Sequence, residues 1–156
     1  MMHRRLRRLL SVAGFLVALL AFASAAQAII IYDFPIFGIV NGTQAARINA
    51  VLSQPPEPDT FCPVTLVFID SAGNQLGGPD TFQLRDGAAV HADFIGDPGI
   101  RPLDRIQLRA QVTIGDPGLF PGCAGGVLAS VEVIDRVTRA THVIVTNPLV
   151  RTTPRS

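Results

Sequence analysis

Several residue types that carry chemistry are scarce or missing in this chain of 156 residues. It contains no lysine and no tryptophan, a single tyrosine (Tyr32), and two methionines, both at the first two positions. Sugar-binding modules commonly use exposed tryptophan or tyrosine rings as flat platforms, so the composition disfavours a carbohydrate-binding role. A blue-copper site needs two histidines, a free cysteine and usually an axial methionine. We therefore expect no copper site.

Positive charge is also scarce once the N-terminal region is set apart. Four of the 13 arginines lie in the first eight positions. The rest of the chain has nine arginines and twelve aspartate and glutamate residues, which gives it a net charge of −3 with histidine neutral. Proteins that bind nucleic acid draw much of their affinity from neutralising phosphates. The charge balance therefore predicts no nucleic-acid partner.

Residues 1–28 have the pattern of a secretory signal peptide. Arginines at positions 4, 5, 7 and 8 precede an apolar run over residues 9–23, and Ala26-Gln27-Ala28 is a small-x-small cleavage site. The alternative is an uncleaved anchor, but a spanning helix needs about 20 apolar residues. We expect cleavage after Ala28, a secreted or periplasmic protein, and no membrane span after cleavage.

Cys62 and Cys123 are the only cysteines. An even number of cysteines in an exported chain predicts one disulfide, and the alternative is two buried free thiols. A bridge would close a loop of about 60 residues, which is worth about 4 kcal/mol in the chain-entropy model. No Cys-x-x-Cys pair is present, so thiol exchange is not predicted.

Alternation with period two dominates the rest of the chain and predicts an all-β fold. In residues 105–114, RIQLRAQVTI, every second side chain is apolar, which indicates an antiparallel strand with one buried face. Turn signals separate about eight such strands, so we predict an antiparallel β-sandwich, immunoglobulin-like in size, over residues 29–147, with a flexible tail over 148–156. The expected strands cover residues 37–40, 45–52, 64–69, 81–84, 89–94, 105–114, 127–133 and 141–146.

The apolar segment 29–40, IIIYDFPIFGIV, allows two interpretations. It can form a first strand within its own sheet, or it can be donated to the sheet edge of another subunit. An apolar strand left free in water promotes aggregation, which favours the first interpretation.

Longer stretches of the chain resemble a group of small exported bacterial proteins built as single β-sandwich domains. The resemblance rests on NGTQAARINAV, CPVTLVFIDSAGNQL and TFQLRDGAAVHADF, followed by an Arg/Gln strand, a second cysteine and a closing strand. It covers roughly residues 42–146 and implies the fold and the compartment. It carries over no functional residues.

One polar cluster is a candidate site. His91 and Asp93 are two residues apart on an expected strand, so their side chains project from the same face, and a neighbouring strand could place Arg105 or Arg109 beside them. This set suits a metal-binding or acid–base pair, or simply a solvated sheet face with cross-strand charge pairs. His142 is the only other histidine after residue 28. Because ligand pairs need further partners, we assign no catalytic, metal or cofactor residue.

The pentapeptide IGDPG occurs at residues 95–99 and again at 114–118. If the strands follow one another as a meander, the two copies lie at opposite ends of the strand 105–114, about 30 Å apart. Asp97 and Asp116 are then turn residues and not two halves of one site. The sequence Asn41-Gly42-Thr43 matches a glycosylation sequon but is also a turn signal.

These observations favour a non-enzymatic binding or structural module whose partner is an unknown envelope or extracellular protein. The chain has no Gly-x-Ser-x-Gly nucleophile motif and no calcium-loop pattern. Two alternatives stay open. One is a small hydrolase or metal-binding protein that uses the face of His91 and Asp93, and the other is an assembly subunit that donates its N-terminal strand.

Overall fold

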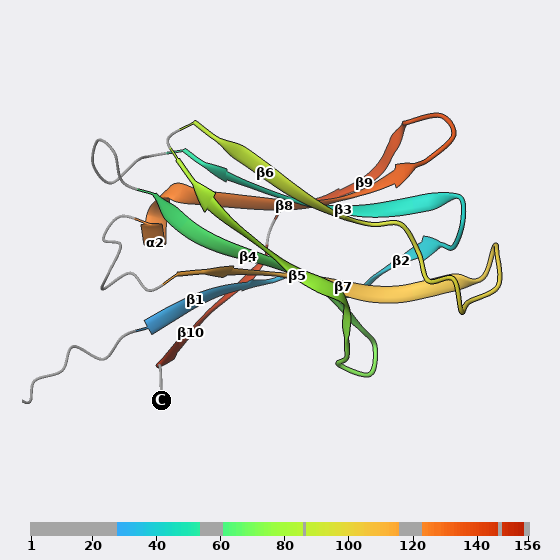
Figure 1. The fold of residues 1–156 in the computed structure, drawn as a ribbon, viewed down its shortest axis with the longest axis horizontal. Coiled ribbons are helices and arrows are strands. Elements are labelled where there is room, and N and C mark those ends of the chain that lie inside the picture. Colours follow the sequence, from blue (N-terminus) through green and yellow to red (C-terminus); the bar gives the residue numbers. More distant parts are fainter. Residues whose placement is uncertain (1–27, 54–60, 86, 116–122, 147, 155–156) are drawn as a thin grey trace, which may run out of the picture.

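The computed structural model describes residues 28–53, 61–85, 87–115, 123–146 and 148–154 (Figure 1). Residues 1–27 of the expected signal peptide, the proline-rich segment 54–60 and the second IGDPG copy from Asp116 onward lie outside the described residues. Within the described part, no helix is long and apolar enough to cross a membrane. The described part contains one helical turn, α2 (Cys123–Gly126), and the strands β1 (Ala28–Asp33), β2 (Phe37–Val40), β3 (Gln44–Leu52), β4 (Cys62–Asp70), β5 (Gln75–Leu84), β6 (Ala89–Phe94), β7 (Arg105–Ile114), β8 (Val127–Asp135), β9 (Thr141–Val145) and β10 (Leu149–Pro154).

The strands form two antiparallel sheets. One sheet has the order β10-β1-β7-β4-β5, with β2 also paired to β7, and the other has the order β6-β3-β8-β9. Figure 1 shows the second sheet in the upper part of the molecule and β1, β10 and β7 in the lower part. The all-β prediction is confirmed.

Buried side chains from both sheets form one core, as period-two strands require. In β7, every second residue from Ile106 to Ile114 is buried, while the residues between them are exposed or half-buried. Burying each Val, Leu or Ile side chain contributes about 1.5–3 kcal/mol. The largest fully buried side chains come from six strands and α2: Ile39, Ile48, Leu52, Leu66, Leu84, Leu108, Ile114, Val64, Val112 and Val131, with both cysteines.

The described part has ten strands and not the eight predicted. The first addition, β1, lies inside its own sheet between β7 and β10. The second, β10, falls in the segment 148–156 that we expected to be a flexible tail, and it pairs with β1 over six residues. The physical reason is that pairing with β7 satisfies only one edge of the apolar strand β1, and β10 covers the other.

The expected meander of strands 89–94 and 105–114 is wrong. In the structure, β6 pairs with β3, whereas β7 pairs with β4, β1 and β2 in the other sheet. The connection 95–104 therefore crosses from one sheet to the other. The first IGDPG copy still precedes β7, and the second begins at Ile114, the last residue of β7, so nine strand residues, 105–113, separate the two copies.

The predicted disulfide is present between Cys62 and Cys123, with a Cα–Cα distance of 5.6 Å. Both residues are fully buried in the core. Cys62 begins β4 in the six-stranded sheet, and α2, which Cys123 begins, leads directly into β8 of the four-stranded sheet. The bridge therefore joins the two sheets covalently at one end.

Candidate functional site

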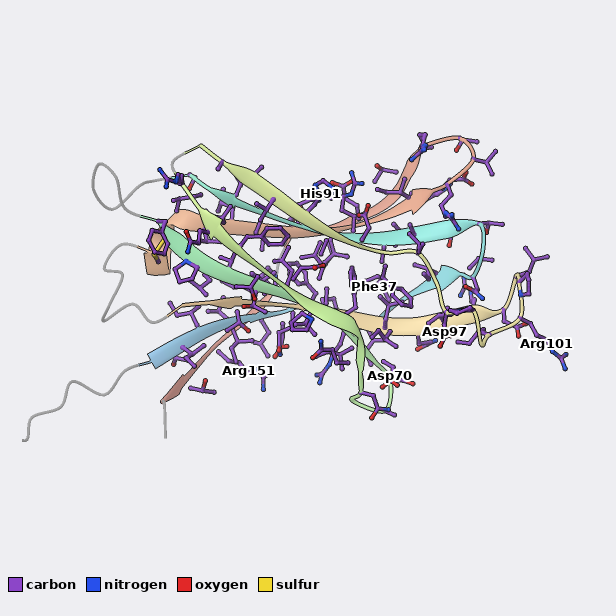
Figure 2. All side chains as sticks on the ribbon, viewed as in Figure 1. Phe37, Asp70, His91, Asp97, Arg101 and Arg151 are labelled. Carbon is purple, nitrogen blue, oxygen red and sulfur yellow. A yellow bond between two sulfur atoms is a disulfide. The ribbon has the colours of Figure 1, made fainter. Side chains whose placement is uncertain are left out.

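The structure separates the four residues of the predicted polar cluster. His91 and Asp93 lie on the outer face of β6, as their spacing predicts, and both are exposed (Figure 2 labels His91). Arg105 and Arg109 belong to β7, which is in the other sheet. Of the four residues, only His91 and Asp93 lie together, and the cationic partner of Asp93 comes from another strand.

That partner is Arg47 on β3. Arg47 lies directly opposite Asp93 in the sheet, and its Nε and Nη2 donate hydrogen bonds to the two Asp93 carboxylate oxygens at 2.7 and 2.8 Å. The hydrogen bond from Arg47 holds the pKa of Asp93 below its usual range, and the charge of Arg47 adds to this. Each side chain is about one third exposed (33% and 36%), so the pair contributes less than about 1 kcal/mol.

Other polar groups of the same sheet are also paired with one another. The amide of Asn49 donates to Glu132 Oε1 at 2.7 Å, and the Thr141 hydroxyl donates to the other oxygen of Glu132 at 3.4 Å. His142 lies 3.8 Å from Asp135 at the β8–β9 turn, well along the sheet from His91. Among the described residues, no three His, Cys, Asp or Glu side chains are grouped so that they could hold a metal ion.

Asn41 organises the first IGDPG copy. Its buried amide Nδ2 faces the carbonyl oxygens of Asp97, Ile100 and Arg101 at 3.0, 2.7 and 3.3 Å, and its Oδ1 accepts a hydrogen bond from Asp97 N at 3.2 Å. The Asp97 carboxylate accepts from Gly99 N at 2.7 Å. Figure 2 shows Asp97 and Arg101 in this loop at one end of the molecule. Asp97 is therefore a turn residue, and the sequon asparagine is a buried structural group.

A groove of about 460 Å³ lies where the edge of β8 faces β1 and β10. Val127 and Ala129 are on the inner face of β8, Leu128 and Ser130 are on its outer face, and all four line the groove, so the groove wraps around the strand edge. None of the described lining residues carries a charge: Tyr32, Asn49, Val51, Val127, Leu128, Ala129, Ser130, Thr146, Pro148 and Val150.

The groove exists because β9 is shorter than β8. β8 pairs with β3 over all nine of its residues, whereas its pairing with β9 covers only residues 131–134. After Val145 the chain leaves the sheet and reaches β10 on the opposite side. The edge of β8 over residues 127–130 is therefore not paired with a described strand. The hydroxyl of Tyr32 donates to the carbonyl of Val127 at 3.3 Å, which shows that this carbonyl points into the groove.

The sequence alone did not predict this groove. Pro148 was the available signal, because proline cannot extend a ladder and so limits the length of the strand before it. The expected strands 127–133 and 141–146 have similar lengths, which predicted a complete hairpin and hid the open edge.

Comparison with known proteins adds little. No protein-family model matches the chain, and no curated protein matches it at a significant level. Among solved structures, the chain is similar to one described as "Crystal Structure of Thermotoga maritima 1070", with 10% identity and a TM-score of 0.42 over 80% of this chain and 93% of that one. A likeness this remote carries no argument, and the expected membership of a group of exported bacterial proteins stays a prediction.

Proposed function

We propose that this protein is an exported β-sandwich domain that acts as a non-enzymatic binding module. Its ligand is an extended segment of an envelope or extracellular protein, which adds as a strand to the open edge of β8. The observation that carries the proposal is the combination of a strand edge that no described strand pairs with and a groove whose described lining residues carry no charge.

The backbone of β8 supplies the affinity in this proposal. Strand addition uses main-chain hydrogen bonds for affinity and pockets for alternate side chains for specificity. The open stretch of four residues, 127–130, offers about 13 Å of edge, at about 3.3 Å per residue. The Val127 carbonyl, which accepts a long bond from the Tyr32 hydroxyl, would be one acceptor for the incoming strand.

The lining of the groove supplies the specificity. Leu128 and Val150 are 58% and 55% exposed although both are apolar, and burying them against a partner would be favourable. Since no described lining residue is charged, the bound segment should present uncharged, mainly apolar side chains at alternate positions. Arg47 and Asp93 do not line the groove, and their charges neutralise each other.

Export is the second part of the proposal. The disulfide is compatible with an extracytoplasmic location, where such bonds persist. The signal-peptide pattern of residues 1–28 supports the same compartment.

A peptide selection tests the proposal. Random extended nonapeptides are selected on the oxidised protein, and the affinity of each selected peptide is measured by calorimetry. We expect Leu128→Asp to weaken binding by about tenfold or more, because a charge in an apolar interface costs well over 1 kcal/mol. Val137→Asp is the matched control, because Val137 is an exposed valine (83%) in the β8–β9 turn, outside the groove.

Backbone methylation of the peptide provides the decisive comparison. In an added strand, alternate amides point toward β8, so methylation of those nitrogens should abolish binding while methylation of the others should not. Two results would show that the edge of β8 is not the binding site. One is equal weakening of binding by methylation of either alternating set of peptide nitrogens. The other is an equal loss of affinity in Leu128→Asp and Val137→Asp.

A further inference from the structure

A second hollow, separate from the β8 groove, opens on the outer face of the six-stranded sheet. Its volume is about 490 Å³, and its described lining residues are Asp33, Phe34, Pro35, Ile36, Arg109, Leu149 and Arg151. Tyr32 and Val150 line the groove, whereas their chain neighbours Asp33 and Arg151 line the hollow. Because consecutive side chains of a strand point to opposite faces, the two spaces lie on opposite sides of β1 and β10.

A bulge between β1 and β2 creates the hollow. Asp33 lies opposite Gln111 and Phe37 lies opposite Leu108, so the three residues 34–36 face only two residues of β7. Phe34 turns into the core and is 2% exposed, whereas Ile36 is displaced outward and is 59% exposed. Pro35, which has no N–H to place in a ladder, suits such a position.

The start of β10 bounds the hollow on the side of β1 that faces away from β7. β10 begins at Leu149, which lies opposite Asp33, so no residue of β10 flanks the bulge itself. Leu149 is 67% exposed although it is apolar. Together with Ile36 and Pro35, it gives the hollow an apolar rim.

The charges in the hollow are unequal. The Asp33 side chain is only 11% exposed, and its carboxylate is held by the Arg151 guanidinium and by Gln111 Nε2, which donates at 2.8 Å. Figure 2 shows Arg151 on the underside of the molecule, beside β1 and β10. Arg151 neutralises Asp33, and the half-buried Arg109 is left as an unbalanced positive charge. Within the described part of the chain, the Arg109 guanidinium has no hydrogen bond and no ion pair.

We propose that this hollow binds a carboxylate attached to an apolar chain, with Arg109 as the residue that recognises the carboxylate. A guanidinium has five N–H donors in a planar fork that matches a carboxylate with two parallel hydrogen bonds. The apolar rim of Ile36, Pro35 and Leu149 contacts the chain of the ligand. A short fatty acid and the C-terminus of a peptide that ends in an apolar residue share this chemistry.

The test is an NMR titration of the isotopically labelled, oxidised protein. The probes are hexanoate and an acetylated tripeptide, Ala-Ala-Leu, with a free C-terminus, and their controls are hexanamide and the amidated tripeptide. We expect at least one carboxylate probe to shift the amide signals of Phe34, Ile36 and Arg109. The tighter of the two probes identifies the source of the carboxylate. The matching amide should bind at least about tenfold more weakly, because charged hydrogen bonds are the stronger ones.

Two arginine variants on one strand make the test specific. Arg109→Gln should weaken binding by about tenfold or more, whereas Arg105→Gln should change it less than about twofold. Arg105 is a matched control because it lies on the same face of β7, is exposed and does not line the hollow.

Four outcomes would overturn the proposal. They are dissociation constants weaker than about 10 mM for both carboxylates, equal binding of the amides, equal losses in the two arginine variants, and the same shifts with sodium chloride at equal ionic strength. None of these four outcomes depends on the β8 groove. If the carboxylate proposal fails, the strand-addition proposal is still decided by the peptide experiment.

Discussion

Removing the side chain of Asn41 should destabilise the protein more than its position in a turn suggests. Asn41 is 6% exposed, and its amide holds the loop 95–104 through the carbonyls of Asp97, Ile100 and Arg101 and the amide of Asp97. The two N–H groups of Asn41 Nδ2 are shared among three carbonyls, and Oδ1 accepts one further bond. Together these contacts correspond to about three hydrogen bonds. At about 1 kcal/mol each, we expect Asn41→Ala to cost about 3 kcal/mol.

The backbone bonds of Asn41 should survive this substitution. Its N donates to the carbonyl of Asp104 at 2.9 Å, and its carbonyl accepts from Leu103 N at 3.0 Å. The variant should therefore keep the crossing between the sheets but loosen the start of the loop. Hydrogen exchange should accelerate at Asp97 N, which loses its acceptor, more than at Leu103 N, which keeps it.

Urea unfolding followed by circular dichroism measures the loss, with Asn74→Ala as the control. Asn74 is also a turn asparagine, and its side chain donates to Asp70 at 2.9 Å, but it is exposed. An exposed substitution of this kind should cost less than about 1 kcal/mol. If Asn41→Ala costs no more than Asn74→Ala, the loop does not depend on the buried amide and the reasoning is wrong.

Three further predictions concern the bridge, one ion pair and the last strand. Replacing both Cys62 and Cys123 by serine should lower the free energy of unfolding by about 4 kcal/mol, for a sequence separation of 61, and urea unfolding measures this. The pKa of Asp93 is lowered in the folded state, mainly by the hydrogen bond from Arg47, so the pair stabilises above about pH 4 and its contribution is lost as the pH falls further. Asp93→Asn should therefore reduce the acid-dependent part of the stability by less than about 1 kcal/mol, and an unchanged profile below pH 4 would contradict this. Deleting residues 149–156 should expose the edge of β1 and cause association detectable by light scattering; a monomeric variant would show that β10 does not protect this edge.

The strands themselves were predictable because period two is a local property. The alternation of residues 105–114 predicted the inner and outer faces of β7 correctly. The even number of cysteines, together with the signal-peptide pattern that predicts export, predicted the bridge. Both inferences need only neighbouring residues or a count.

Strand order was not predictable in the same way. The ten residues 95–104 are long enough either to turn back along the same sheet or to cross to the other one. The choice is tied to Asn41, which lies more than 50 residues earlier in the chain and binds the loop through its side chain. The prediction that Arg105 could lie beside Asp93 assumed that consecutive strands pair. It was wrong because the connection crosses to the other sheet. The true partner, Arg47, has no local signal that distinguishes it from the other arginines.

The C-terminal strand gives the strongest link between fold and function. Residues 149–154 carry little apolar alternation, and they form a strand by pairing with the edge of β1. Once paired, successive side chains of β10 line both candidate sites: Val150 contributes to the uncharged groove, and Leu149 and Arg151 contribute to the hollow beside Arg109. Ligands in the two sites would therefore contact opposite faces of one edge strand. Since an edge strand is held by one neighbour alone, binding at either site should stabilise β10 against fraying and so favour binding at the other.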